Sequence, residues 1–147
     1  MRLWIFQGNP DSFDIDGYLR TAAAQLTWTV TRYADEIAVG DHVYLWRNQG
    51  QQMAVAGVVA EAEIITPTEL RAESPDAVPF RPSGAEEAIN PAQRALLRLM
   101  RVARPREVIR REWCTEDPIL RELPNLKMAA GTNYRLSREH AERLGAL

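Results

Sequence analysis

Apolar and polar positions alternate through the first half of the chain. "RLWIFQ" predicts a strand over residues 3–7, and "HVYLWR" and "MAVAGVVAEAEII" predict two more strands after residue 41. "TWTVTRY" alternates strictly, with Trp28, Val30 and Arg32 on one face and three threonines on the other. Turn-forming residues separate these segments. The pattern therefore predicts a run of short β-strands.

Helical signals occur mainly in the second half. Asn90 is an N-cap residue, Pro91 stands at the first helical position and Gln93 completes a capping box, so we expect a helix over residues 90–103. "PREVIRREW" predicts a strand, and Ser137 caps a last helix in "REHAERLGAL". Residues 66–90, rich in proline, predict a long excursion from the sheet.

The order of these elements indicates the fold class. No alternating βαβ units occur, which argues against a doubly wound parallel sheet. We expect an α+β protein, a small, strongly bent mixed β-barrel with peripheral helices. Its 147 residues suit a single domain spanning residues 1–147.

Composition narrows the class of protein. The net charge of −2 disfavours non-specific coating of nucleic acid, although a local basic groove is compatible with it. One cysteine, Cys114, cannot form an internal disulfide, and no apolar run approaches the roughly 20 residues of a membrane span. The first ten residues reach Gln7 and Gly8 too early for a signal peptide. We expect a cytoplasmic protein with no membrane partner.

Motifs for catalysis are missing from the sequence. Neither zinc-ligand spacings nor phosphate-binding glycine loops nor a nucleophile elbow occur, so we expect no metal, no cofactor and no enzymatic activity. Cys114 is expected to pack as a small hydrophobe.

The tryptophans are the most informative residues. Trp4 and Trp113 are expected in the core, whereas Trp28 and Trp46 stand at strand ends beside polar or basic residues. Two indoles at such a place either fill the core or form a flat-walled pocket, where each stacked base contributes about 1–3 kcal/mol. Asn9, in the turn after the first strand, offers an amide that can read a base edge.

Four segments in this order resemble the EVE domain: "LWIFQGNPDSFDIDGYL", "WTVTRYADEIAVGDHVYLWR", "AGVVAEAEI" and "GTNYRLS". EVE domains are similar in fold to PUA and YTH domains, and YTH domains extrude a methylated adenine of RNA into an aromatic cage. The resemblance spans nearly the whole chain. It implies a PUA-like fold and a non-catalytic reader of modified bases, such as 5-methylcytosine, in DNA or RNA.

The resemblance also implies site residues. Trp28 and Thr29 match a cage wall with its base-binding hydroxyl, Asn9 matches the polar residue after the first strand, and Trp46 is expected in the same pocket. Thr132 and Asn133 match the loop that approaches the base. The second cage wall is expected within residues 66–82, where Phe80 is the sole aromatic residue.

Partners follow from the same resemblance. We expect a nucleic acid carrying modified bases, contacted at phosphates or bases by Arg32 and Arg47, and a restriction-type or other effector protein. Two alternatives are an enzyme or sensor that binds a small molecule or nucleotide in the same pocket, and a protein-interaction module whose indoles are all buried.

Overall fold

The structure is a computed structural model that describes residues 1–21, 23–50, 56–81 and 91–146. Its strands are β1 (Leu3–Gly8), β2 (Gln25–Thr29), β3 (His42–Arg47), β4 (Gly57–Arg71), β5 (Ala92–Val102), β6 (Ile109–Arg110) and β7 (Asn133–Leu136). The α-helices are α1 (Ile15–Leu19), α3 (Arg111–Glu116), α4 (Pro124–Lys127) and α5 (Arg138–Gly145), and the 3₁₀ helices are η2 (Pro75–Phe80) and η3 (Leu120–Glu122).

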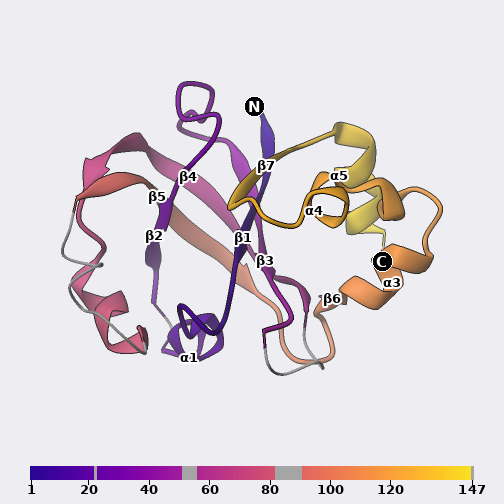
Figure 1. The fold of residues 1–147 in the computed structure, drawn as a ribbon, viewed down its shortest axis with the longest axis horizontal. Coiled ribbons are helices and arrows are strands. Elements are labelled where there is room, and N and C mark those ends of the chain that lie inside the picture. The colour runs from indigo at the N-terminus through magenta and orange to yellow at the C-terminus, as the bar shows by residue number, and fades with distance from the viewer. Residues whose placement is uncertain (22, 51–55, 82–90, 147) are drawn as a thin grey trace.

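The described strands form one mixed sheet in the order β2-β5-β4-β3-β1-β7, with β6 paired to β4. β1 and β3 are parallel, and the other pairs are antiparallel. β4 carries three register shifts against β5, which indicate β-bulges, and bulges bend a sheet. Helices α3, α4 and α5 gather on one side of the sheet (Figure 1). This is the predicted α+β class of fold with a bent mixed sheet, but the strand ladders among the described residues do not close it into the predicted barrel.

The two edge strands of this order meet at Asn133. The side-chain oxygen of Asn133, in β7, accepts hydrogen bonds from the amides of Thr31 and Arg32 just after β2, at 3.1 and 3.2 Å. Its side-chain NH₂ donates to the carbonyl of Arg32. One fully buried amide therefore joins the edges where the described backbone shows no ladder between them.

Two hydrophobic clusters lie on opposite faces of β1 and β3. Trp4, Phe6, Val43 and Leu45 point into the bend of the sheet, together with Trp28. The alternate residues Ile5, Tyr44 and Trp46 pack in the second cluster with Leu120, Leu123 and other residues of the C-terminal helices. A strand buried on both faces shows little polar alternation, and its sequence therefore does not reveal which residues face which cluster.

The helix predicted for residues 90–103 is wrong, because β5 occupies Ala92–Val102 and Asn90 lies outside the described residues. Arg94, Arg98 and Arg101 are spaced as on a helix face, but two of them pair with glutamates of the neighbouring strand. Arg98 bonds Glu63 at 3.0 Å and Arg101 bonds Glu61 at 2.6 Å, each directly opposite its partner in β4. Pairing with β2 and β4 on both sides overrides the local helical signal.

Three smaller predictions also fail. The excursion expected from residue 66 begins later, because β4 continues to Arg71. The strand expected in "PREVIRREW" shortens to β6, after which α3 begins at Arg111. Trp113, expected in the core, is 42% exposed, with the guanidinium of Arg110 lying 5.8 Å from the centre of one of its rings. Trp4 is buried as predicted, and its indole N–H donates to Asp41 at 2.9 Å.

Candidate functional site

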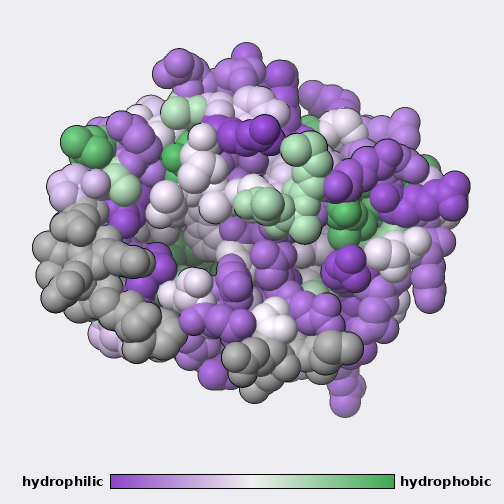
Figure 2. Space-filling view, in the orientation of Figure 1, coloured by the Kyte–Doolittle hydropathy of each residue, from purple (hydrophilic) through white to green (hydrophobic). Residues whose placement is uncertain are grey.

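A cavity of about 140 Å³ opens beside the end of β1. Four parts of the chain supply its walls: β1 with the following turn, β2, the segment around η2, and the loop before β7. The described lining residues are Gln7, Gly8, Asn9, Ser12, Phe13, Ile15, Thr27, Trp28, Thr29, Glu73, Arg81 and Thr132. The face in Figure 2 is mostly hydrophilic, with hydrophobic groups scattered over it.

Trp28 supplies the larger aromatic wall. Its ring lies 6.3 Å from that of Phe6, and 8% of the residue remains exposed. A Cβ on Gly8 would lie 3.0 Å from Cη2 of Trp28. The absence of a side chain at Gly8 therefore lets the indole lie directly against the β1 backbone.

The turn after β1 positions Phe13 and Ser12. The side-chain oxygen of Asn9 accepts from the amide of Asp11 at 2.9 Å, and the Asn9 carbonyl accepts from the amides of Ser12 and Phe13 at 3.0 and 3.2 Å. These bonds are typical of Asx-type turns. The guanidinium of Arg81 lies 5.1 Å from the centre of the Phe13 ring, within cation–π range.

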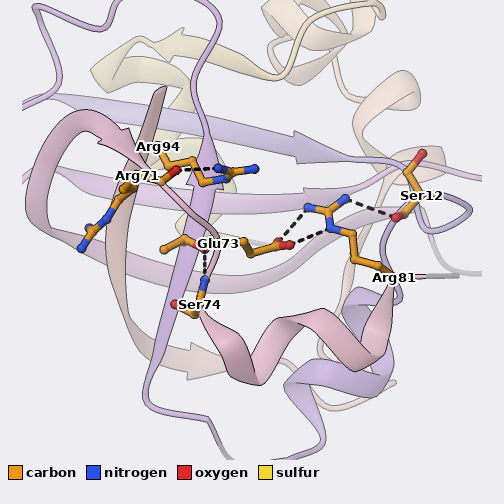
Figure 3. A network of polar contacts seen from close by, with 7 residues as sticks. Ser12, Arg71, Glu73, Ser74, Arg81 and Arg94 are labelled. Carbon is orange, nitrogen blue, oxygen red and sulfur yellow. Dashed lines mark hydrogen bonds and ion pairs between the residues drawn. The ribbon is translucent and has the colours of Figure 1, made fainter. Parts of the chain in front are cut away.

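Glu73 and Arg81 form a bidentate ion pair in the wall (Figure 3). Nε and Nη2 of Arg81 donate to the two carboxylate oxygens of Glu73 at 2.8 and 2.7 Å, while Nη1 donates to the carbonyl of Ser12 at 3.3 Å. The Glu73 side chain is only 2% exposed. The pair therefore fixes η2 and the turn around Ser12 to each other.

Arg94 lies on the other side of Glu73 (Figure 3). This arginine is 5% exposed, and its Nη1 donates to the carbonyl of Arg71 at 2.6 Å. Burial lowers the pKa of Arg94, and the charge of Glu73 opposes that effect. The buried Glu73 carboxylate therefore lies between two arginines.

The loop before β7 is fixed by Gln7. Its side-chain NH₂ donates to the carbonyls of Ala129 and Gly131 at 2.9 and 3.1 Å, and its backbone amide donates to the carbonyl of Thr132 at 2.8 Å. The hydroxyls of Thr132 and Thr31 lie 2.8 Å apart. Thr132 is thus held at the cavity by bonds to β1 and to the end of β2.

The structure brings together four of the predicted base-pocket residues, because Asn9, Trp28, Thr29 and Thr132 all line the cavity. Asn133 lies next to it, but its amide joins the sheet edges. What these residues bind stays a prediction.

Trp46 and Arg47 occupy other places. Trp46 is 1% exposed and packs in the second cluster, because alternation in β3 turns it away from the face that holds Trp28. Arg47 is 3% exposed and pairs with Asp16 at 2.8 Å. Arg32 is exposed and lines a neighbouring cleft of about 520 Å³ with Thr31 and residues 128–131.

From the range 66–82, where the second cage wall was expected, Glu73 and Arg81 line the cavity, and Phe80 is absent from the lining. Its ring packs edge-on against Tyr18 at 5.6 Å. The lining also contains residues that the sequence did not predict. No local pattern marks Glu73 or Arg81, whereas Phe13 is an aromatic residue just after the Gly8-Asn9-Pro10 turn, a context that could have identified it.

The lone cysteine is buried, and no metal cluster is found among the described residues. Cys114 is fully buried, and burial raises the pKa of its thiol to about 11, so it remains protonated at neutral pH. Across residues 1–21, 23–50, 56–81 and 91–146, no group of three or more His, Cys, Asp or Glu side chains could hold a metal ion. The helices in the same ranges include none long and apolar enough to cross a membrane.

The fold of the chain is similar to that of several solved structures, whose fold is PUA-like. The DUF55 domain of human thymocyte nuclear protein 1 matches with a TM-score of 0.66 and 12% identity, over 98% of this chain and 96% of that chain. Human THYN1 protein in complex with 5-methylcytosine containing DNA matches with a TM-score of 0.66 and 14% identity, over 99% of this chain and 97% of that chain. A hypothetical protein from Leishmania major matches with a TM-score of 0.66 and 18% identity, over 99% of this chain and 93% of that chain.

No family model matches the sequence, and no curated protein matches it. Identities this low show the fold alone. The predicted resemblance to the EVE family is confirmed at that level, since the fold is that of the DUF55, or EVE, domain.

Proposed function

We propose that this protein is a non-catalytic reader of modified bases in nucleic acid, and that it takes one flipped base into the cavity beside Gly8. The observation that carries the proposal is the cavity itself, with the rings of Trp28 and Phe13 in its lining and polar groups from four segments around them. Aromatic faces stack on a base, and fixed polar groups read its edge.

The fold adds support, because a structure with the same fold is known in complex with 5-methylcytosine containing DNA. Flipping a base out of a duplex costs a few kcal/mol, and stacking on Trp28 offsets a comparable amount. The net charge of −2 predicts weak non-specific attraction to phosphates, so that contacts to the flipped base carry much of the binding.

The lining also favours binding over catalysis. Neither histidine nor cysteine occurs among the described residues that line the cavity. Its hydroxyl groups, on Ser12, Thr27, Thr29 and Thr132, therefore have no imidazole base beside them there.

The test is a fluorescence anisotropy titration at fixed, stated salt with duplexes that differ only in one central base, cytosine or 5-methylcytosine. A panel of other modified bases follows. We expect the wild type to prefer a modified duplex over the plain one, and Trp28→Ala to lose that preference.

Trp113→Ala is the matched control, since Trp113 is an exposed tryptophan in α3 outside the cavity lining. Circular dichroism verifies that each variant is folded. Equal binding of all duplexes by the wild type, or an unchanged preference in Trp28→Ala, rejects the proposal.

A further inference from the structure

The cavity wall contains one group that can only accept hydrogen bonds. Glu73 lines the cavity, yet its side chain is 2% exposed and both oxygens are bound by Arg81 at 2.7 and 2.8 Å. A carboxylate offers about four lone-pair sites, and Arg81 uses two of them. Each oxygen therefore keeps the capacity to accept one more hydrogen bond from a group inside the cavity.

The position of this acceptor is fixed before any ligand binds. Arg81 is itself held by the carbonyl of Ser12 and lies over the ring of Phe13, so the arginine end of the ion pair is anchored (Figure 3). Thr27 accepts from the amide of Ser74 at 3.2 Å, which fixes the backbone next to Glu73. A pre-positioned acceptor discriminates between ligands because it does not rearrange to suit each of them.

The size of the cavity limits what can reach Glu73. About 140 Å³ is close to the roughly 150 Å³ of an engineered protein cavity that takes up benzene. One six-membered ring fits such a space. A purine has two fused rings and would have to leave part of its surface outside.

From these features we propose that Glu73 determines specificity by accepting a hydrogen bond from the exocyclic amino group of a flipped pyrimidine. The cavity then selects cytosine-type bases and rejects thymine and uracil, whose carbonyl at the same ring position would face a carboxylate oxygen. Acidic side chains accept from the cytosine amino group in the same way in other protein–DNA contacts. This inference rests on the function proposed above, and names the edge of the base that is read.

The experiment uses five single-stranded oligonucleotides that differ at one central position: cytosine, 5-methylcytosine, uracil, thymine or an abasic site. 5-Methylcytosine and thymine share the methyl group and differ only along the hydrogen-bonding edge. The four bases thus separate the effect of the methyl group from that of the amino group. We expect the wild type to prefer 5-methylcytosine over thymine by roughly 10- to 100-fold, the range of one good base-specific contact.

Two variants assign this preference to Glu73. Glu73→Gln keeps the shape but can present an NH₂ group to a carbonyl, and we expect the preference over thymine to fall to within about threefold. Glu73→Asp withdraws the carboxylate by one methylene, so we expect an intermediate preference. Glu63→Gln controls for the Glu-to-Gln change itself, because Glu63 also bonds an arginine, Arg98 at 3.0 Å, but is absent from the cavity lining.

The outcomes separate this inference from the proposed function. If the wild type binds all five oligonucleotides equally, the proposed function fails and the inference fails with it. If the bases bind better than the abasic site through Trp28, but 5-methylcytosine and thymine bind equally, only the role of Glu73 is overturned. A preference for thymine would mean that the Arg81 guanidinium reads the base, which also overturns it. Should Glu73→Gln not fold, the wild-type comparison and Glu73→Asp still decide.

Discussion

A Cβ added to Gly8 would lie 3.0 Å from Cη2 of Trp28, and 3.1 Å from Cζ2. The aromatic wall of the cavity therefore rests on the backbone of β1. The Trp28 indole, which would stack on a base, is thus coupled mechanically to β1, the strand that leads into the Asn9 turn. Any group added at residue 8 moves the indole.

Gly8→Ala tests this contact. We expect a loss of about 1–3 kcal/mol in the free energy of unfolding, because the new methyl group overpacks against the indole, and a weaker preference for a modified base. Trp28→Phe removes the benzo-ring atoms that would clash. The double variant Gly8→Ala/Trp28→Phe should therefore be more stable than the sum of the two single losses predicts. Urea unfolding measures all four proteins.

Gly145→Ala is the control for the glycine substitution itself. Gly145 ends α5, and a Cβ there meets no atom within 4 Å. We expect it to gain up to about 1 kcal/mol of stability. Strictly additive losses in the Gly8/Trp28 cycle would contradict the coupling.

Asn133→Ala tests the junction between the sheet edges. The variant loses bonds to the amides of Thr31 and Arg32 and to the Arg32 carbonyl from a fully buried position, and we expect a loss of about 2–3 kcal/mol. Hydrogen exchange should accelerate at the Thr31 and Arg32 amides. Arg135→Ala, on the same strand, removes an exposed pair with Glu36 at 3.3 Å and should cost less than 1 kcal/mol. Equal losses in both variants would show that Asn133 has no special role.

The strands were predicted best where the type of each residue indicates a strand without knowledge of its partners in the fold. β1 to β3 and the first half of β4 were predicted from runs of apolar and β-forming residues between turns, whereas β5 carries Arg94, Arg98 and Arg101 at helical spacing. Their partners, such as Glu61 and Glu63, come from another strand, and only the tertiary structure brings them opposite each other.

The residues that line the cavity were predicted best where they stand in a turn or at the end of a strand. Trp28, Thr29 and Asn9 have that context in the sequence. Trp46 was assigned to the wrong face because β3 is buried on both sides, and hydrophobicity alone does not distinguish them. Glu73 and Arg81 come from a segment without periodicity, and η2 between them brings them into contact.

Arg32 and Arg47, predicted together as contacts to nucleic acid, should now behave differently. Arg32 is exposed beside the cleft that contains residues 128–131, so we expect Arg32→Ala to weaken binding to all bases alike. A plot of log affinity against log salt concentration should be less steep for Arg32→Ala than for the wild type. The difference in slope should correspond to the loss of about one phosphate contact. Arg47→Met should leave that slope unchanged and cost about 1–2 kcal/mol of stability, because the partly exposed Asp16 loses its partner.

These two variants are compared by titration at several salt concentrations and by urea unfolding. A salt slope that changes in Arg47→Met would mean that the Arg47–Asp16 pair opens on binding. An unchanged slope in Arg32→Ala would place the phosphate path elsewhere on the surface.

Acid should destabilise the C-terminal helices through Asp117. Its carboxylate accepts from Nε of Arg143 at 2.7 Å and from the amides of Leu120 and Ile119 at 3.0 and 2.9 Å, and these bonds, with that from Arg143 foremost, lower its pKa to about 2. A carboxyl group with a lower pKa in the folded protein stabilises the fold above its unfolded pKa of about 4, and that stabilisation is lost as the pH falls toward 2.

We therefore expect the melting temperature of the wild type to fall between about pH 4 and pH 2, and the fall to be shallower in Asp117→Asn. The amide oxygen of Asn can still accept from the Leu120 and Ile119 amides, so this variant isolates the charge. Arg143→Gln removes the largest cause of the pKa shift, so the melting temperature should also fall less steeply between about pH 4 and pH 2 in this variant. The double variant Asp117→Asn/Arg143→Gln should show little further change. If all four proteins lose stability with the same steepness, other carboxylates control the acid response, and the Asp117–Arg143 pair contributes only packing.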